Sequence, residues 1–263
     1  MSSEVDLEME LWEHVEELVE RARKIIITWF TAMIFVAFAP SSLLKYPPSF
    51  NLDFNSNYET IVGAFIEYVK EQTAPPNILL IAGTWTGSIE LYFNAAMLLG
   101  FIIALPVISY EIYAFVKPAL YPEEKSAAFK FAASFIFLFV LGALISFYIV
   151  IPVTLRILTY FIDMIGAQPM FFVDDYYNFI FLSTILIGLV FTFPNWVYIL
   201  VKIGLIDHED LVGNRKNFIL GVSIVTAVLT PDPTPFSMLI ISIPLIVLYE
   251  ISIYVAKKAE YEV

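Results

Sequence analysis

Six long runs of apolar residues, separated by shorter polar stretches, dominate the pattern of this chain. A helix that crosses the roughly 30 Å hydrocarbon core of a bilayer needs about 20 mostly apolar residues. The pattern therefore predicts an all-α integral membrane protein with six transmembrane helices. The candidate spans cover residues 25–39 (which can extend to 44), 91–116, 129–151, 177–201, 218–230 and 236–256.

Two of these spans carry particular expectations. We expect the fifth and sixth spans to be short, because the fifth has only 13 residues and reaches about 20 Å at a rise of 1.5 Å per residue. Such a helix either thins the bilayer locally or packs against protein. A single re-entrant hairpin made of both runs is the alternative. Pro152 is expected to end the third span, because its ring cannot continue the helical hydrogen bonds.

Two amphipathic helices are predicted outside the spans. Residues 1–24 form one that continues into the first span, in which Glu17 and Arg21 stand four residues apart, as Glu20 and Lys24 do. A solvated helix surface with weak ion pairs is the other interpretation of that spacing. The second helix lies in the segment 40–90, where five apolar residues recur at helical spacing before Pro75 and Pro76: Ile61, Val62, Phe65, Ile66 and Val69.

The distribution of basic residues predicts the orientation. Eleven of the 14 Lys and Arg residues fall on the side that six spans assign to both termini. Since cytoplasmic loops are enriched in Lys and Arg, both termini are expected in the cytoplasm and the segment 40–90 outside.

Composition narrows the class of protein. Hydrophobic residues make up 59% of the 263 residues and charged residues 15%, whereas a soluble domain has about 45–50% and roughly 25%. A soluble enzyme is therefore excluded. The net charge of −12 argues against binding of nucleic acid. The chain has no cysteine and only two histidines, so we expect no metal site and no cofactor.

We find no catalytic constellation, neither H-E-x-x-H nor G-x-S-x-G, and expect no enzyme. A secondary transporter or channel is the competing class, but it usually places ionisable groups mid-membrane. Glu111 and Glu250 instead lie near the cytoplasmic ends of their spans, where each can reach water or pair with a lysine. The chain is therefore interpreted as a scaffold with a cytoplasmic recognition surface.

The loop 117–128 is the second candidate element of that surface. Pro118 and Pro122 stiffen it, and it presents Leu120 and Tyr121 beside Glu124. A rigid loop that combines apolar anchors with carboxylates suits the binding of a peptide. A simple connection between two helices is the alternative.

Three segments resemble TatC, the polytopic receptor subunit of the twin-arginine protein translocase. They are HVEEL at 14–18, PVISYEIYAFVKPALYPEEK at 106–125 and LTPDPTPFSMLIISIPLIVLYE at 229–250. The resemblance implies a single domain over 1–263 in the plasma membrane of a prokaryote. It also implies an oligomeric complex with TatA/TatB-like single-span subunits, and export driven by the proton-motive force.

By position, the resemblance places twin-arginine signal peptides of folded precursors at Glu17 and Glu124. It adds six neighbours to this signal-peptide site: His14, Arg21, Phe115, Leu120, Tyr121 and Lys125. The chemistry agrees, because a carboxylate can hold a planar guanidinium through two hydrogen bonds, which an ammonium cannot match.

Three departures from the family pattern stand out. Val19 replaces a common arginine, Thr192 replaces a buried Glu or Gln ahead of Pro194, and Asp232 matches the external turn only loosely. Thr192, Pro194 and Thr226 are candidates for contact with a partner's single helix. The alternative for the two threonines is a hydrogen bond to the carbonyl of the preceding helical turn.

Overall fold

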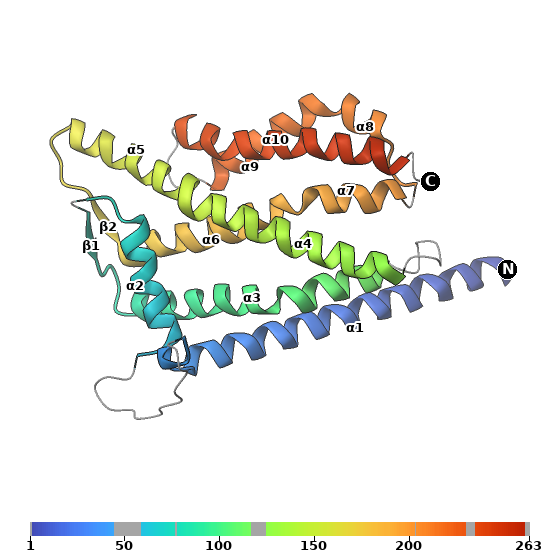
Figure 1. Cartoon of the computed structure of the whole chain (residues 1–263), viewed down its shortest axis with the longest axis horizontal. Helices are drawn as coiled ribbons and strands as arrows, with labels where there is room; N and C mark the ends of the chain where they lie inside the picture. Colours follow the sequence, from blue (N-terminus) through green and yellow to red (C-terminus); the bar gives the residue numbers. More distant parts are fainter. Residues whose placement is uncertain are drawn as a thin grey trace.

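The computed structural model describes residues 2–44, 59–76, 78–116, 125–202, 204–229 and 235–260, and the chain is helical over most of them (Figure 1). The helices are α1 (Ser2–Phe38), α2 (Ile61–Thr73), α3 (Gly87–Val116), α4 (Lys125–Ile145), α5 (Ile151–Met164), α6 (Val173–Phe191), α7 (Phe193–Lys202), α8 (His208–Gly213), α9 (Arg215–Leu229) and α10 (Pro235–Glu260). Shorter elements are a 3₁₀ turn (Ser41–Leu44), a π-helical turn (Ser146–Val150) and strands β1 (Leu79–Ile81) and β2 (Met170–Phe172).

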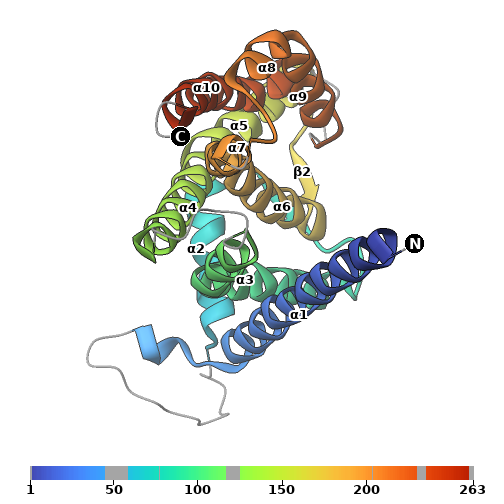
Figure 2. The ribbon, with the colours of Figure 1, turned by 90° about the vertical axis from the view of Figure 1, so that its right-hand side faces the viewer.

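The long helices lie roughly along one direction. The start of α1 and the end of α10 lie at one end of the molecule, where α3 also ends and α4 begins (Figure 1). Helix α2 and the two strands, which pair in parallel, lie at the opposite end. Seen from the first end, α1 and α3 form one side, α8, α9 and α10 the other, and α4, α6 and α7 lie between (Figure 2).

Among the residues that the structure describes, four helical stretches are long and apolar enough to cross a membrane: Gly87–Phe115, Lys130–Met164, Val173–Lys202 and Met238–Lys258. They correspond to predicted spans two, three, four and six. Helix α9 has 15 residues, as short as expected, but α10 has 26, so the prediction of a short sixth span was wrong. Pro244 lies inside α10 without ending it, and Lys257 and Lys258 occupy its last turn.

The first predicted span ends earlier than its apolar run. Helix α1 is continuous from the predicted amphipathic segment into the span, but it stops at Phe38 and does not extend through Pro40 to Leu44. Helical geometry is unfavourable for the residue that precedes a proline. The chain instead turns back, and the backbone amide of Ser41 donates to the backbone carbonyl of Glu59 at 2.8 Å.

The prediction that Pro152 ends the third span was also wrong. Helix α4 continues through the π-helical turn Ser146–Val150 directly into α5, with Pro152 at the start of α5. Proline is tolerated in the first turn of a helix, where its missing amide hydrogen has no helical partner. The wider π-helical turn accommodates this proline, so the helix is not interrupted.

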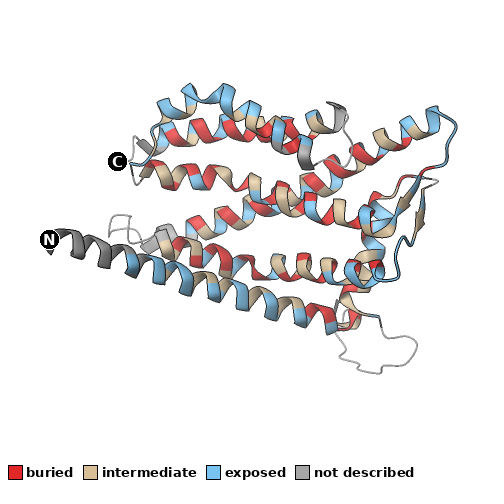
Figure 3. Ribbon diagram, turned by 180° about the vertical axis from the view of Figure 1, so that it is seen from behind, coloured by how far each residue is buried: buried red, intermediate tan, exposed pale blue. Residues whose placement is uncertain are grey.

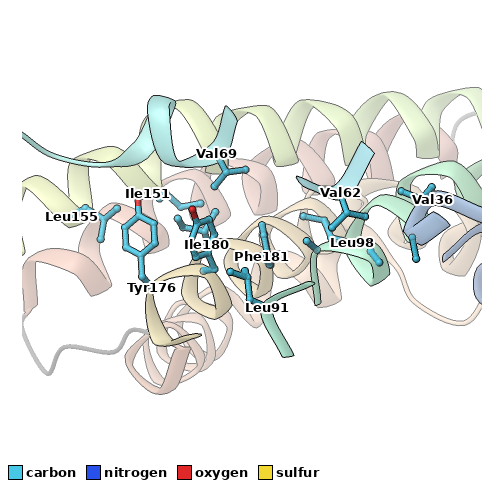
Figure 4. Close-up of a cluster of buried hydrophobic side chains, with 14 residues drawn as sticks. Val36, Val62, Val69, Leu91, Leu98, Ile151, Leu155, Tyr176, Ile180 and Phe181 are labelled. Carbon is cyan, nitrogen blue, oxygen red and sulfur yellow. The ribbon is translucent and has the colours of Figure 1, made fainter. Parts of the chain in front are cut away.

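The predicted helix of the segment 40–90 is confirmed as α2, which packs across one end of the bundle. Its first turn is capped by Thr60, whose hydroxyl accepts from the amide of Gly63 at 3.0 Å. Val62 and Val69 are fully buried and meet Ile180 and Phe181 of α6 in a common core (Figure 4). The amphipathic pattern therefore reflects burial against the other helices.

Candidate functional site

A three-residue ion-pair network joins α1 to α3 at the end of the molecule where α1 begins. Arg21 donates from Nη2 to Glu17 Oε1 at 2.5 Å, and from Nε to the same oxygen at 3.0 Å. Its remaining terminal nitrogen, Nη1, donates to Glu111 Oε2 at 3.1 Å. One guanidinium therefore connects a carboxylate on its own helix with one that lies 90 residues further along the chain.

The three side chains differ in their access to solvent. The side chain of Glu111 is 11% exposed, that of Arg21 21% and that of Glu17 33%. Glu111 is the innermost charge of the three, and Glu17 is the most exposed. Helix α1 exposes residues along much of its length while α3 is more buried, as Figure 3 shows.

Close packing of α1 on α3 holds this network in place. A Cβ built on Gly100 of α3 would lie 2.7 Å from the backbone nitrogen of Met33, so the two helices approach at a residue without a side chain. Trp29 of α1 donates from Nε1 to the carbonyl of Met97 on α3 at 3.0 Å. Both contacts fix the rotation of α1 that directs Arg21 at Glu111.

The network shifts the pKa of Arg21. The hydrogen bond to Glu17 raises the pKa of Arg21 above its ordinary value, burial lowers it, and the hydrogen bond to Glu111 raises it again. A raised pKa on a basic group means that its stabilisation is present below the unfolded-state pKa and is lost only as pH rises through the folded one. Deprotonation of Arg21 therefore removes none of this stabilisation at any pH below the ordinary pKa of arginine.

The structure describes part of the predicted signal-peptide site. Glu17 and Arg21 lie together, and Phe115 lies half-buried one turn beyond Glu111 on α3. Lys125 begins α4 at the same end of the molecule, and His14 lies on α1 one turn before Glu17, although neither side chain is described. Leu120, Tyr121 and Glu124 lie outside the described residues.

Sequence reasoning placed Glu111 at a membrane boundary but did not assign it to the site. We expected Glu111 and Glu250 to reach water or to pair with lysine; Glu250 does reach water, since its side chain is 50% exposed, and each of the two pairs with an arginine in place of a lysine. The partner of Glu250 is Arg215, at 2.9 Å. The i,i+4 pairs of α1 are confirmed, since Lys24 also lies 2.8 Å from Glu20. Val19 is 61% exposed on α1.

Of the candidate partner-contact residues, Thr192 lies between α6 and α7, Pro194 on α7 and Thr226 on α9. Thr192 and Thr226 are fully buried within the chain, and their hydroxyls donate to the carbonyls of Leu189 and Val222, at 2.7 and 2.8 Å. Both threonines therefore make the hydrogen bond to the preceding turn that sequence analysis gave as the alternative. Thr226 also lies 3.0 Å from the hydroxyl of Ser242 on α10.

Comparison with known proteins gives concordant results. The model of a family described as "Sec-independent protein translocase protein (TatC)" matches residues 13–244. A protein of that name from Carboxydothermus hydrogenoformans is 34% identical over 252 residues, covering 96% of this chain and 94% of that protein. One from Aquifex aeolicus is 36% identical over 185 residues, 70% of this chain and 76% of that protein.

A solved structure is also similar. The crystal structure titled "Twin Arginine Translocase Receptor- TatC" superposes with a TM-score of 0.77 at 30% sequence identity. The match covers 94% of this chain and 99% of that chain. The similarity therefore includes the arrangement of the helices over nearly the whole length of both proteins.

Proposed function

We propose, from the premise that this chain belongs to the TatC family of Sec-independent protein translocase proteins, that it is the receptor for twin-arginine signal peptides. Membership makes it a multi-pass membrane component of protein transport, a transport subunit rather than a catalytic enzyme. The proposed ligands are the signal peptides of folded precursor proteins.

The proposed topology has six spans, with α1 and α9 added to the four long helical stretches. Both termini face the cytoplasm of a prokaryote and α2 lies outside the plasma membrane. The bias of Lys and Arg toward one side supports this orientation. In this arrangement residues 1–24 and the loop 117–128 lie on the same cytoplasmic surface of a single domain 1–263.

The observation that carries the proposal is that Glu17 already binds a guanidinium. Arg21 reaches Glu17 through two nitrogens and Glu111 through a third. An arginine of a signal peptide can take the place of Arg21 on Glu17, since Arg21 would keep its bond to the more buried Glu111. The resemblance assigns the second arginine to Glu124, with Phe115, Leu120 and Tyr121 beside the peptide and His14 and Lys125 at its edge.

The energies favour discrimination between arginine and lysine pairs. A fully exposed ion pair contributes about 0.2–1 kcal/mol, whereas a hydrogen bond to a charged group that is partly desolvated contributes about 1.5–3 kcal/mol. Glu17, at 33% exposure, lies between these limits. Two such carboxylates would select a planar, bidentate donor, the guanidinium of arginine, at both positions.

Assembly with TatA/TatB-like single-span subunits completes the proposed function, with the proton-motive force as driving force. We place a partner helix along α7 and α9, near Thr192, Pro194 and Thr226. Because all three residues are buried within this chain, a partner would reach them only if these helices separate.

Crosslinking of a signal peptide to the full-length chain in membranes tests the receptor site. Glu17→Ala and Glu124→Ala should each weaken crosslinking of a peptide with paired arginines, and the double variant should reduce it at least tenfold. A peptide with paired lysines should crosslink weakly to the unaltered chain. Glu16→Ala is the matched control, because Glu16 is an exposed glutamate on the same turn of α1.

Undiminished crosslinking in the double variant would reject the assignment of these carboxylates. The transporter or channel alternative makes a different prediction: liposomes that contain this chain alone should then show substrate-dependent flux. The proposed receptor should show none without its partner subunits.

A further inference from the structure

A groove of about 930 Å³ lies between α4, α7 and α10, on the side of the molecule away from the Arg21 network. Figure 2 shows these helices grouped together when the molecule is viewed from the end where α10 finishes. One face of α4 and of the π-helical turn that follows it lines the groove, at a spacing of three or four residues: Lys130, Ser134, Leu138, Leu141, Ile145 and Ile149. We infer that this groove binds one anionic phospholipid, with its headgroup at Lys130 and Lys258.

The charges at the mouth of the groove define the headgroup. Lys130 lies near the start of α4 and Lys258 near the end of α10, and these helix ends lie at the same end of the molecule (Figure 1). Both lysines are exposed and line the groove, and none of the lining residues that the structure describes is acidic. Basic pockets between membrane helices favour anionic headgroups.

One helical turn deeper, side chains with hydroxyl groups line the groove in place of the lysines. Ser134 follows Lys130 by four residues on α4, and Tyr254 precedes Lys258 by four on α10. Ser134 also donates to Asn195 Oδ1 on α7 at 2.8 Å, while the buried Asn195 Nδ2 has no hydrogen-bond partner within the described residues. Asn195 Nδ2 and the Tyr254 hydroxyl lie where the phosphate and glycerol esters of a lipid would need donors, while the one hydroxyl hydrogen of Ser134 is already used on Asn195.

Deeper still, the lining is apolar. Leu141 lies 11 residues beyond Lys130 on α4, which is roughly 16 Å along the helix and close to half of a 30 Å hydrocarbon core. The order along the groove is therefore cation, hydroxyl and hydrocarbon over the depth of one leaflet. A phospholipid has the complementary order of phosphate, ester and acyl chain. A transmembrane helix of a partner subunit would match the apolar part but not the pair of lysines.

Native mass spectrometry of the full-length chain in detergent tests this inference. The probes are phosphatidylglycerol and phosphatidylcholine with the same acyl chains. The unaltered chain should retain one phosphatidylglycerol with at least tenfold higher affinity than phosphatidylcholine, since a basic residue at the membrane surface contributes roughly a fivefold preference. Lys130→Gln and Lys258→Gln should each lower the preference about fivefold.

Two further variants separate a bound lipid from a general surface effect. Lys257→Gln is the matched control, because Lys257 is exposed beside Lys258 but does not line the groove, and it should leave the preference unchanged. Leu141→Trp should lower retention of both lipids by filling the apolar part. Equal affinity for the two lipids, or an equal loss in the Lys257 and Lys258 variants, would overturn the inference. If a partner helix prevents either lipid from binding in the groove, the groove is the binding site of that helix and the inference is overturned.

Discussion

Arg21 illustrates how one residue can serve stability and recognition together. It neutralises Glu111, whose side chain is 11% exposed, and it occupies Glu17, the carboxylate proposed for the ligand. Breaking a buried ion pair by removing one partner is costly, because the remaining charge stays desolvated. Replacing both partners by apolar groups costs far less.

Arg21→Met should therefore lower the free energy of unfolding by about 1–3 kcal/mol, since Glu111 is left without its cation. The double variant Arg21→Met/Glu111→Leu should recover most of this loss. The midpoint of thermal unfolding of the full chain in detergent measures both effects.

Lys24→Met is the control for the Arg21 variant. Lys24 pairs with Glu20 across two exposed side chains, so its removal should change stability little. An Arg21→Met chain as stable as the unaltered one would contradict a structural role for the network.

At the scale of the elements, glycines determine how closely the helices approach. Gly142 of α4 faces Phe191 of α6, and Gly188 of α6 faces Phe139 of α4, so that each helix accommodates an aromatic ring of the other. A Cβ at either glycine would lie within 3.0 Å of that ring. At Gly100 the obstacle is the backbone of Met33, which cannot move aside as a ring can.

Gly100→Ala should consequently separate α1 from α3 and destabilise the chain by about 1–3 kcal/mol. The same separation would lengthen the bond between Arg21 and Glu111, so crosslinking of a signal peptide should fall as well. Gly221→Ala on α9 is the matched control, because a Cβ there meets no atom within 4 Å. Equal thermal stability of the two variants would contradict the packing argument.

At the scale of the whole molecule, the proposed topology depends on how many helices cross the bilayer. Four stretches of the described part of the chain meet the requirement of length and hydropathy, while α1 has a charged first half and α9 has 15 residues. The proposed topology needs both as spans. Because the chain has no cysteine, single cysteines report accessibility without a background.

Labelling of intact cells with a membrane-impermeant maleimide checks this topology. Cysteines at Gly166, between α5 and β2, and at Asp232, between α9 and α10, should react from outside. A cysteine at Gly213 should react only after permeabilisation. Reaction at Gly166 but not at Asp232 would favour the re-entrant hairpin.

Several features of the molecule could be predicted from local sequence. The apolar runs, the amphipathic pattern of α2 and the i,i+4 pairs of α1 depend on residues within one or two turns of each other. Helix α8 was missed, although Asp207 and Asp210 form a capping box at its start and were a readable signal. The strands β1 and β2 have three residues each, too few to show a period.

By itself, then, the sequence determined a helical membrane protein of the TatC family, the strong bias of its basic residues toward one side and the i,i+4 pairing of Glu17 with Arg21. Only the tertiary structure decided that Arg21 binds Glu111, that Pro152 continues a helix, and that Lys130 and Lys258 share one groove. The reason is physical. Periodicity reports which face of a helix is apolar, but contacts between distant residues depend on how helices approach and rotate against each other, which close packing of the whole chain determines.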